Sequence, residues 1–103
     1  MQTFIMLTRL AHSALGNPKE LEALEKQVMD RISGQCPKVK WVASYAILGP
    51  HDYLDVFQAP DTQTAMQVSA IVRSFGHAKT EIWGATEWKR FKKMIRNLPD
   101  VAA

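Results

Sequence analysis

The stretch YAILGPHDYLDVFQAPD, residues 45–61, decides the fold of this chain. Two runs of strand-forming residues, 45–48 and 53–58, flank the turn formers Gly49-Pro50-His51-Asp52, a pattern that predicts a β-hairpin. A second break, Ala59-Pro60-Asp61, leads directly into a helical pattern. The hairpin therefore joins two units of the same kind, each made of a strand, a helix and a strand.

The elements on either side of the hairpin are marked by local signals. Asn17 and Asp61 are helix-capping residues placed before apolar residues at helical spacing, and Gly76 is a helix stop. Apolar runs rich in strand formers supply the remaining strands. The expected strands cover 3–10, 39–48, 53–58 and 78–85, and the expected helices cover 18–33, 62–75 and 87–98.

The order β–α–β–β–α–β predicts an α+β fold, the ferredoxin-like sandwich. Right-handed crossovers in both units place two helices on one face of a four-stranded antiparallel sheet with strand order 4-1-3-2. We expect residues 1–86 to form this domain and residues 87–103 to form a basic amphipathic C-terminal helix and tail.

Charge and composition limit the partners and the location. The basic and acidic residues of 1–86 cancel, so the net charge of +3 arises entirely in 87–103. This balance disfavours nucleic acid as a partner of the domain, and no stretch is long and apolar enough to cross a membrane. The N-terminus lacks the pattern of a signal peptide and Cys36 is the only cysteine, which predicts a cytoplasmic protein.

Two helices cover only one face of the sheet, so the character of the other face matters. We expect Leu54, Val56 and Ile82 to lie under the helices. The opposite face is then strongly aromatic, and a patch of this kind usually marks an interface. It predicts a homodimer whose sheets pack face to face, the alternative being a monomer whose terminal helix folds back over the sheet. The residues assigned to this face are Phe4, Met6, Thr8, Trp41, Tyr45, Tyr53, Asp55, Phe57, Glu81 and Trp83.

Residues at both breaks and in the last strand resemble the pattern of the GYD-domain family. They are Tyr45, Leu48-Gly49, Asp52, Ala59-Pro60-Asp61, Gly76 and Lys79-Thr80-Glu81. The resemblance covers about residues 3–86, and it implies a dimeric α+β barrel without assigning an activity. Related barrels are similar to cofactor-free monooxygenases, isomerases, haem-degrading enzymes and ligand-sensing modules. His51 stands where the tyrosine of the family's name would fall, and Asp55 stands where the family usually has an aliphatic residue.

Asp55 and Glu81 are the sharpest candidates for chemistry, because an acid in an apolar cavity has a raised pKa and can serve as a general base. Tyr45 is the candidate hydrogen-bond donor beside them. The expected ligand-binding residues are Met6, Thr8, Trp41, Phe57 and Trp83. The competing interpretation is that both acids are paired with Lys or Arg side chains or with a tyrosine of the partner copy and fix the dimer register.

The sequence is compatible with three functions. They are a small-molecule-binding homodimer of the GYD type, a cofactor-independent monooxygenase or isomerase with a carboxylate base, and an interaction module that acts through the basic C-terminal helix. We expect the apolar stripe of that helix to dock on its own body or across the dimer. The sequence leaves open whether the protein is an enzyme.

No metal site or cofactor is expected. His12, His51 and His77 fall in three separate loops without metal-ligand spacing, and Cys36 has no histidine near it in sequence. The glycines match no nucleotide-binding fingerprint.

Overall fold

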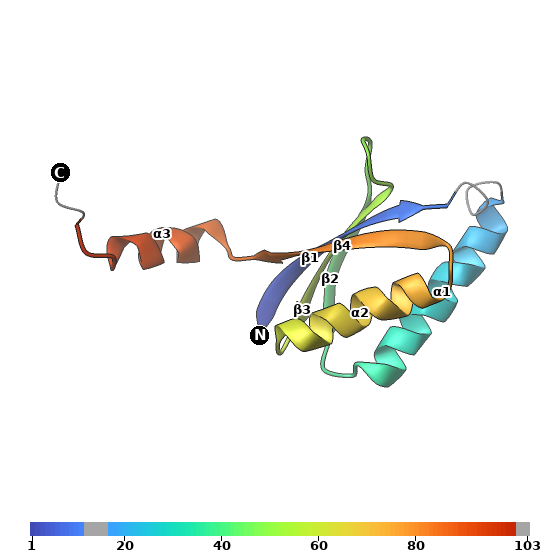
Figure 1. Ribbon diagram of the computed structural model, residues 1–103, viewed down its shortest axis with the longest axis horizontal. Helices are drawn as coiled ribbons and strands as arrows, with labels where there is room; N and C mark the ends of the chain where they lie inside the picture. The colour runs from blue at the N-terminus through green and yellow to red at the C-terminus, as the bar shows by residue number, and fades with distance from the viewer. Residues whose placement is uncertain (12–16, 101–103) are drawn as a thin grey trace.

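A computed structural model describes residues 1–11 and 17–100 of the chain. Figure 1 shows helices packed against one face of a sheet, with the last helix of the chain extending beyond the end of that sheet. The elements, in chain order, are β1 (Gln2–Leu10), α1 (Pro18–Gln35), β2 (Lys40–Ala46), β3 (Tyr53–Ala59), α2 (Thr62–Ser74), β4 (Ala78–Ala85) and α3 (Trp88–Arg96).

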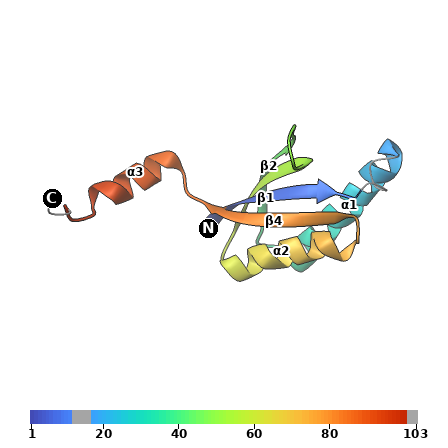
Figure 2. The same ribbon diagram turned by 45° about the horizontal axis from the view of Figure 1, so that its top comes forward.

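The sheet has the order β2-β3-β1-β4, and all of its neighbouring strands are antiparallel. This is the predicted order, and the α+β ferredoxin-like prediction is confirmed. Helices α1 and α2 lie side by side on one face, as the turned view in Figure 2 also shows. We call this the helix face of the sheet and the opposite side the outer face.

Local signals place the ends of the elements. The Asn17 side chain accepts hydrogen bonds from the backbone N–H groups of Lys19 and Glu20, and Asp61 caps α2 by accepting one from Thr64. Gly76, just after α2, has a φ of 75°, a conformation that favours glycine. In the hairpin the Ile47 N–H donates to the Asp52 carbonyl at 3.0 Å, which closes the loop around the predicted turn.

The core lies between the sheet and the two helices. Phe4, Met6 and Phe57 belong to it, together with Ile32 of α1 and Val68 of α2. Because directly paired residues of antiparallel strands share a face, the pairing of Met6 with Asp55 and with Ile82 places all three on the helix face.

The expected assignment of the two faces was wrong for most positions. The structure puts Phe4, Met6, Thr8, Trp41, Tyr53, Asp55 and Phe57 on the helix face, whereas Leu54 and Val56 lie on the outer face. Ile82 lies under the helices as expected, and Glu81, Trp83 and Tyr45 lie on the outer face as expected. A shift of one residue exchanges the faces of a strand, and both sets of β3 residues are apolar enough to be buried.

The outer face is nevertheless apolar. Ile5, Leu54, Val56 and Trp83 lie on it, and Trp83 remains 53% exposed. Helix α3 does not cover these residues: it extends past the end of the sheet, away from α1 and α2 (Figures 1 and 2). None of the nine residues of α3 is buried. The expectation that this helix docks on its own body is therefore wrong, and docking across a dimer stays a prediction.

Candidate functional site

A cavity of about 240 Å³ lies on the helix face, between the sheet and the two helices. Strands β1, β2 and β3 form one wall, and the inward residues of α1 with the end of α2 form the other. The lining includes Met6, Thr8, Glu25, Val28, Trp41, Ser44, Tyr45, Tyr53, Asp55 and His77.

Asp55 is the acid in the interior of this cavity. It stands in the middle of β3, paired with Met6 on one side and Ser44 on the other, and its side chain is half-buried. Burial raises the pKa of Asp55 above its ordinary value. Hydrogen-bonding groups of Ser44 and Trp41 act in the opposite direction, and the charge of Glu25 raises the pKa further. Burial is the largest of these effects, so Asp55 holds a proton more readily than an exposed aspartate does.

A β-bulge in β2 brings Trp41 and Ser44 beside Asp55. The register shifts between Trp41 and Ala43, so Val42 is an extra residue in the strand. Residues three apart in a regular strand point to opposite faces, but the bulge turns Trp41 and Ser44 to the same face. The Trp41 indole N–H donates to the Ser44 hydroxyl at 2.8 Å.

Phe57 lies beneath the cavity rather than in its wall. Its ring is fully buried and stacks against the Trp41 ring, with centroids 5.2 Å apart and planes 10° apart. Phe57 therefore holds Trp41 in place, which differs from the ligand contact that we expected of it.

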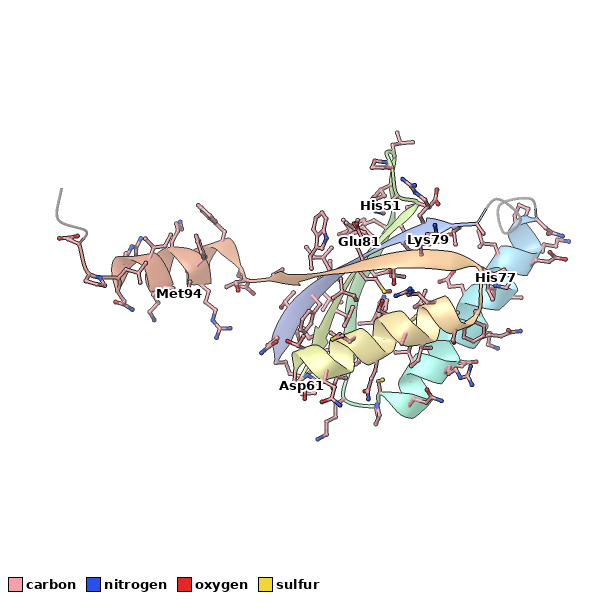
Figure 3. The ribbon with its side chains drawn as sticks, in the orientation of Figure 1. His51, Asp61, His77, Lys79, Glu81 and Met94 are labelled. Atoms are coloured by element: carbon pink, nitrogen blue, oxygen red, sulfur yellow. The ribbon has the colours of Figure 1, made fainter. Side chains whose placement is uncertain are left out.

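His77 is a cavity residue that sequence reasoning missed. It lies just before β4, at the end of the sheet where α2 has finished, as Figure 3 shows. Its Nδ1 atom is buried without a hydrogen-bond partner in the described part of the chain. The sequence placed it only in a loop after the second helix, and nothing in Gly76-His77 signals the cavity. The lining residues of α1, such as Glu25 and Val28, were missed as well, although their helical spacing to Leu21 could have indicated an inward position.

Glu81 and Asp55 are not neighbours, so the predicted pair of acids is wrong. Glu81 lies on the outer face and is 56% exposed, and its carboxylate lies 3.2 Å from Nε2 of His51 in the hairpin. Figure 3 shows both residues on the side of the sheet away from the helices. Trp83 shares that face, while Tyr45 is mostly exposed on the edge strand β2 and reaches only the rim of the cavity. Of the three candidates for catalysis, Asp55 alone lies inside the cavity.

The other reactive groups of residues 1–11 and 17–100 form no metal site. Among the described residues there is no group of three or more His, Cys, Asp or Glu side chains that could hold a metal ion. His12 lies outside the described residues. Burial raises the pKa of the Cys36 thiol, which disfavours the reactive thiolate. Within the described chain, no helix is both long and apolar enough to span a bilayer.

The fold and the cavity define a ferredoxin-like α+β domain with a pocket between its sheet and its helices. The chain belongs to the GYD-domain family, whose sequence profile it matches over residues 4–95. The expected resemblance is thus confirmed, and the match extends past residue 86 into α3.

The chain is similar to several known proteins, among them a relative in sequence and a solved structure. A protein of Thermus thermophilus is 33% identical over 84 residues, which span 78% of this chain and 83% of that protein. It is named "Glutamine synthetase and cystathionine beta-lyase binding protein". A crystal structure of FFRP-DM1 matches with a TM-score of 0.54 and 19% identity, covering 84% of this chain and 100% of that one. At that identity the second likeness supports the fold alone.

Proposed function

We propose that this chain is a binding module of the GYD type that holds a small molecule between its sheet and its helices. The observation that carries the proposal is the cavity of about 240 Å³ with a half-buried carboxylate, Asp55, in its wall. An apolar pocket with a few converging polar groups is the usual form of a small-molecule site. The site lies on the face opposite to the one that the sequence led us to expect.

A native mass spectrum of the protein purified from its own host tests this function. We expect an added mass that is lost in the variant Val28→Phe, because that ring would fill the cavity from α1. Met66→Phe is the matched control, since Met66 is exposed on α2 and does not line the cavity. An added mass that Val28→Phe retains, or no added mass in the natural protein, would refute the proposal.

The module is proposed to act as a homodimer through the outer face. Ile5, Leu54, Val56 and Trp83 make that face apolar, and the exposed ring of Tyr45 adjoins it on β2. Sedimentation at micromolar concentration is expected to give twice the chain mass of 11.6 kDa. A single species at 11.6 kDa would reject the dimer.

A second candidate function is the binding of another protein. The name of the Thermus thermophilus relative supports it, and so does the exposed apolar stripe of α3, where Trp88 and Ile95 are surrounded by basic residues. Binding of the chain to purified glutamine synthetase and cystathionine beta-lyase can be measured by interferometry, with and without residues 87–103. Binding that does not depend on these residues would leave α3 without this role.

Of the two predicted acids, only Asp55 still supports the hypothesis of a cofactor-independent enzyme. Glu81 lies on the other face and Tyr45 reaches only the rim, so Asp55 is the one predicted catalytic residue inside the cavity. This makes a binding module the function that the geometry supports best.

A further inference from the structure

The charged side chains that line the cavity in the described part of the chain are both carboxylates. Asp55 reaches it from β3 and is half-buried, while Glu25 reaches it from α1 and is exposed to solvent. One acid therefore lies inside the cavity and the other lies at its solvent end. A negatively charged ligand would meet two like charges there, whereas a positively charged ligand would be attracted by both.

Both acids act on Tyr53 in the cavity wall. Besides burial, the charges of Glu25, of Asp52 in the hairpin and of Asp55, in that order, raise the pKa of Tyr53. Glu25 also contributes to the raised pKa of Asp55. A cation near Asp55 and Glu25 would reduce the repulsion between their carboxylates, so the electrostatics of the cavity favour a positively charged ligand.

Aromatic rings in the wall suit a cation as well. Trp41 and Tyr53 line the cavity, while Tyr45 reaches only its rim, and the Trp41 N–H is already used by Ser44. Positive charge is attracted to the faces of such rings, with tryptophan the strongest. The ring of Phe75, which also lines the cavity, already has the Arg31 guanidinium 5.6 Å from its centre.

The volume limits the size of the ligand. An engineered protein cavity of roughly 150 Å³ holds one benzene molecule. The space of about 240 Å³ here therefore admits one ring with a short chain, or an aliphatic body of similar size. A dinucleotide or a haem is too large for it.

We propose that the cavity binds a small primary amine with an aromatic or branched aliphatic body, its ammonium group held by Asp55 with Glu25 at the entrance. This inference rests on the proposed small-molecule function and adds the chemical class of the ligand. Neither acid has a lysine or arginine as an ion-pair partner among the described residues. An ammonium group of the ligand would therefore be the cation that pairs with them. The apolar body would lie against Met6, Val28 and Trp41.

Three probes that differ only in their polar end test the class: 3-phenylpropylamine, 3-phenylpropanol and 3-phenylpropionate. Calorimetry with the full chain at pH 7.5 is expected to show tightest binding of the amine and weakest binding of the carboxylate. Asp55→Asn should weaken amine binding about tenfold and Glu25→Gln by less, because Glu25 is screened by water. Glu22→Gln is the matched control, since Glu22 is exposed on the same helix and does not line the cavity.

Each outcome decides a separate point. Binding of the alcohol or the carboxylate as tightly as the amine overturns the amine class and leaves the small-molecule function standing. Equal amine affinity in the natural chain and in Asp55→Asn, whose fold is checked by circular dichroism, overturns the role of Asp55 and with it the proposal. If none of the probes binds, the amine class is overturned, and the native mass spectrum described above then decides separately whether the cavity holds any ligand.

Discussion

Replacing Phe57 with alanine tests the central feature of this fold, the assignment of side chains to the two faces of the sheet. Phe57 has an exposed fraction of 0%, and its ring lies between those of Phe4 and Trp41, with centroids 5.8 Å and 5.2 Å away. A buried Phe→Ala substitution costs ~3–5 kcal/mol of unfolding free energy. Because the stacking contacts of Phe57 with Phe4 and Trp41 are lost as well, we expect the upper part of this range, about 4–5 kcal/mol.

The assay is urea unfolding followed by tryptophan fluorescence at several protein concentrations. Trp83→Ala is the control: the same kind of aromatic deletion, but at an outer-face position that is 53% exposed. Its cost is expected to stay below ~1 kcal/mol at concentrations where the chain is monomeric, with its main effect on self-association. Phe57→Leu should lose less than ~1.5 kcal/mol, because it keeps most of the buried volume. Equal losses in Phe57→Ala and Trp83→Ala for the monomer would refute the assignment of the faces.

Three further outcomes follow from the same structure. Burial raises the folded-state pKa of Asp55, so the contribution of this side chain to stability falls as the pH rises from the unfolded pKa of about 3.8 through the raised folded pKa. Asp55→Asn should therefore be more stable than the natural chain at pH 7.5. Urea midpoints that show no gain at pH 7.5, or a gain that does not shrink at pH 3.5, would contradict this. The cap contact with Thr64 lowers the pKa of Asp61, so the stabilisation by the cap is present above the unfolded pKa and is lost as the pH falls through the lowered folded pKa. Asp61→Ala should lower the melting temperature at pH 7. A difference in melting temperature that persists unchanged in strong acid would argue against the cap. Deleting residues 88–103 should leave the unfolding free energy of the monomer within ~0.5 kcal/mol, because no residue of α3 is buried, and a larger loss at low protein concentration would mean that the helix packs on its own domain.

The positions of the elements could be predicted because their signals are local. Asn17, Asp61 and Gly76 each act on backbone groups within a few residues, and each is found at the expected helix end. The hairpin is likewise signalled by residues 49–52 and closed by the Ile47–Asp52 hydrogen bond next to them, and Asp52 adds bonds to β1 that the local pattern does not show. The strand order followed from the number of crossovers and their hand, which leave few alternatives.

The faces of the strands could not be fixed in the same way. On β3 the alternating sets are Leu54 with Val56 and Asp55 with Phe57, and hydrophobicity favours the first set for the core. The structure buries the second set, because Phe57 fills the space against Phe4 and Trp41, while Asp55 opens onto the cavity. Which face two helices cover is a tertiary property, and alternation within one strand contains no information about it.

It is easier to predict which residues share a face of the sheet than which face the helices cover. This explains why much of the candidate site was predicted as a group but assigned to the wrong face. Met6, Asp55 and Ser44 are directly paired across three strands, so they stay together whichever side the helices take. The pairing of Met6 with Ile82 breaks the predicted group at β4, because it turns Glu81 to the other side. One residue of register in that last strand therefore separates a site with two interior acids from the observed cavity with Asp55 inside and Glu25 at its entrance.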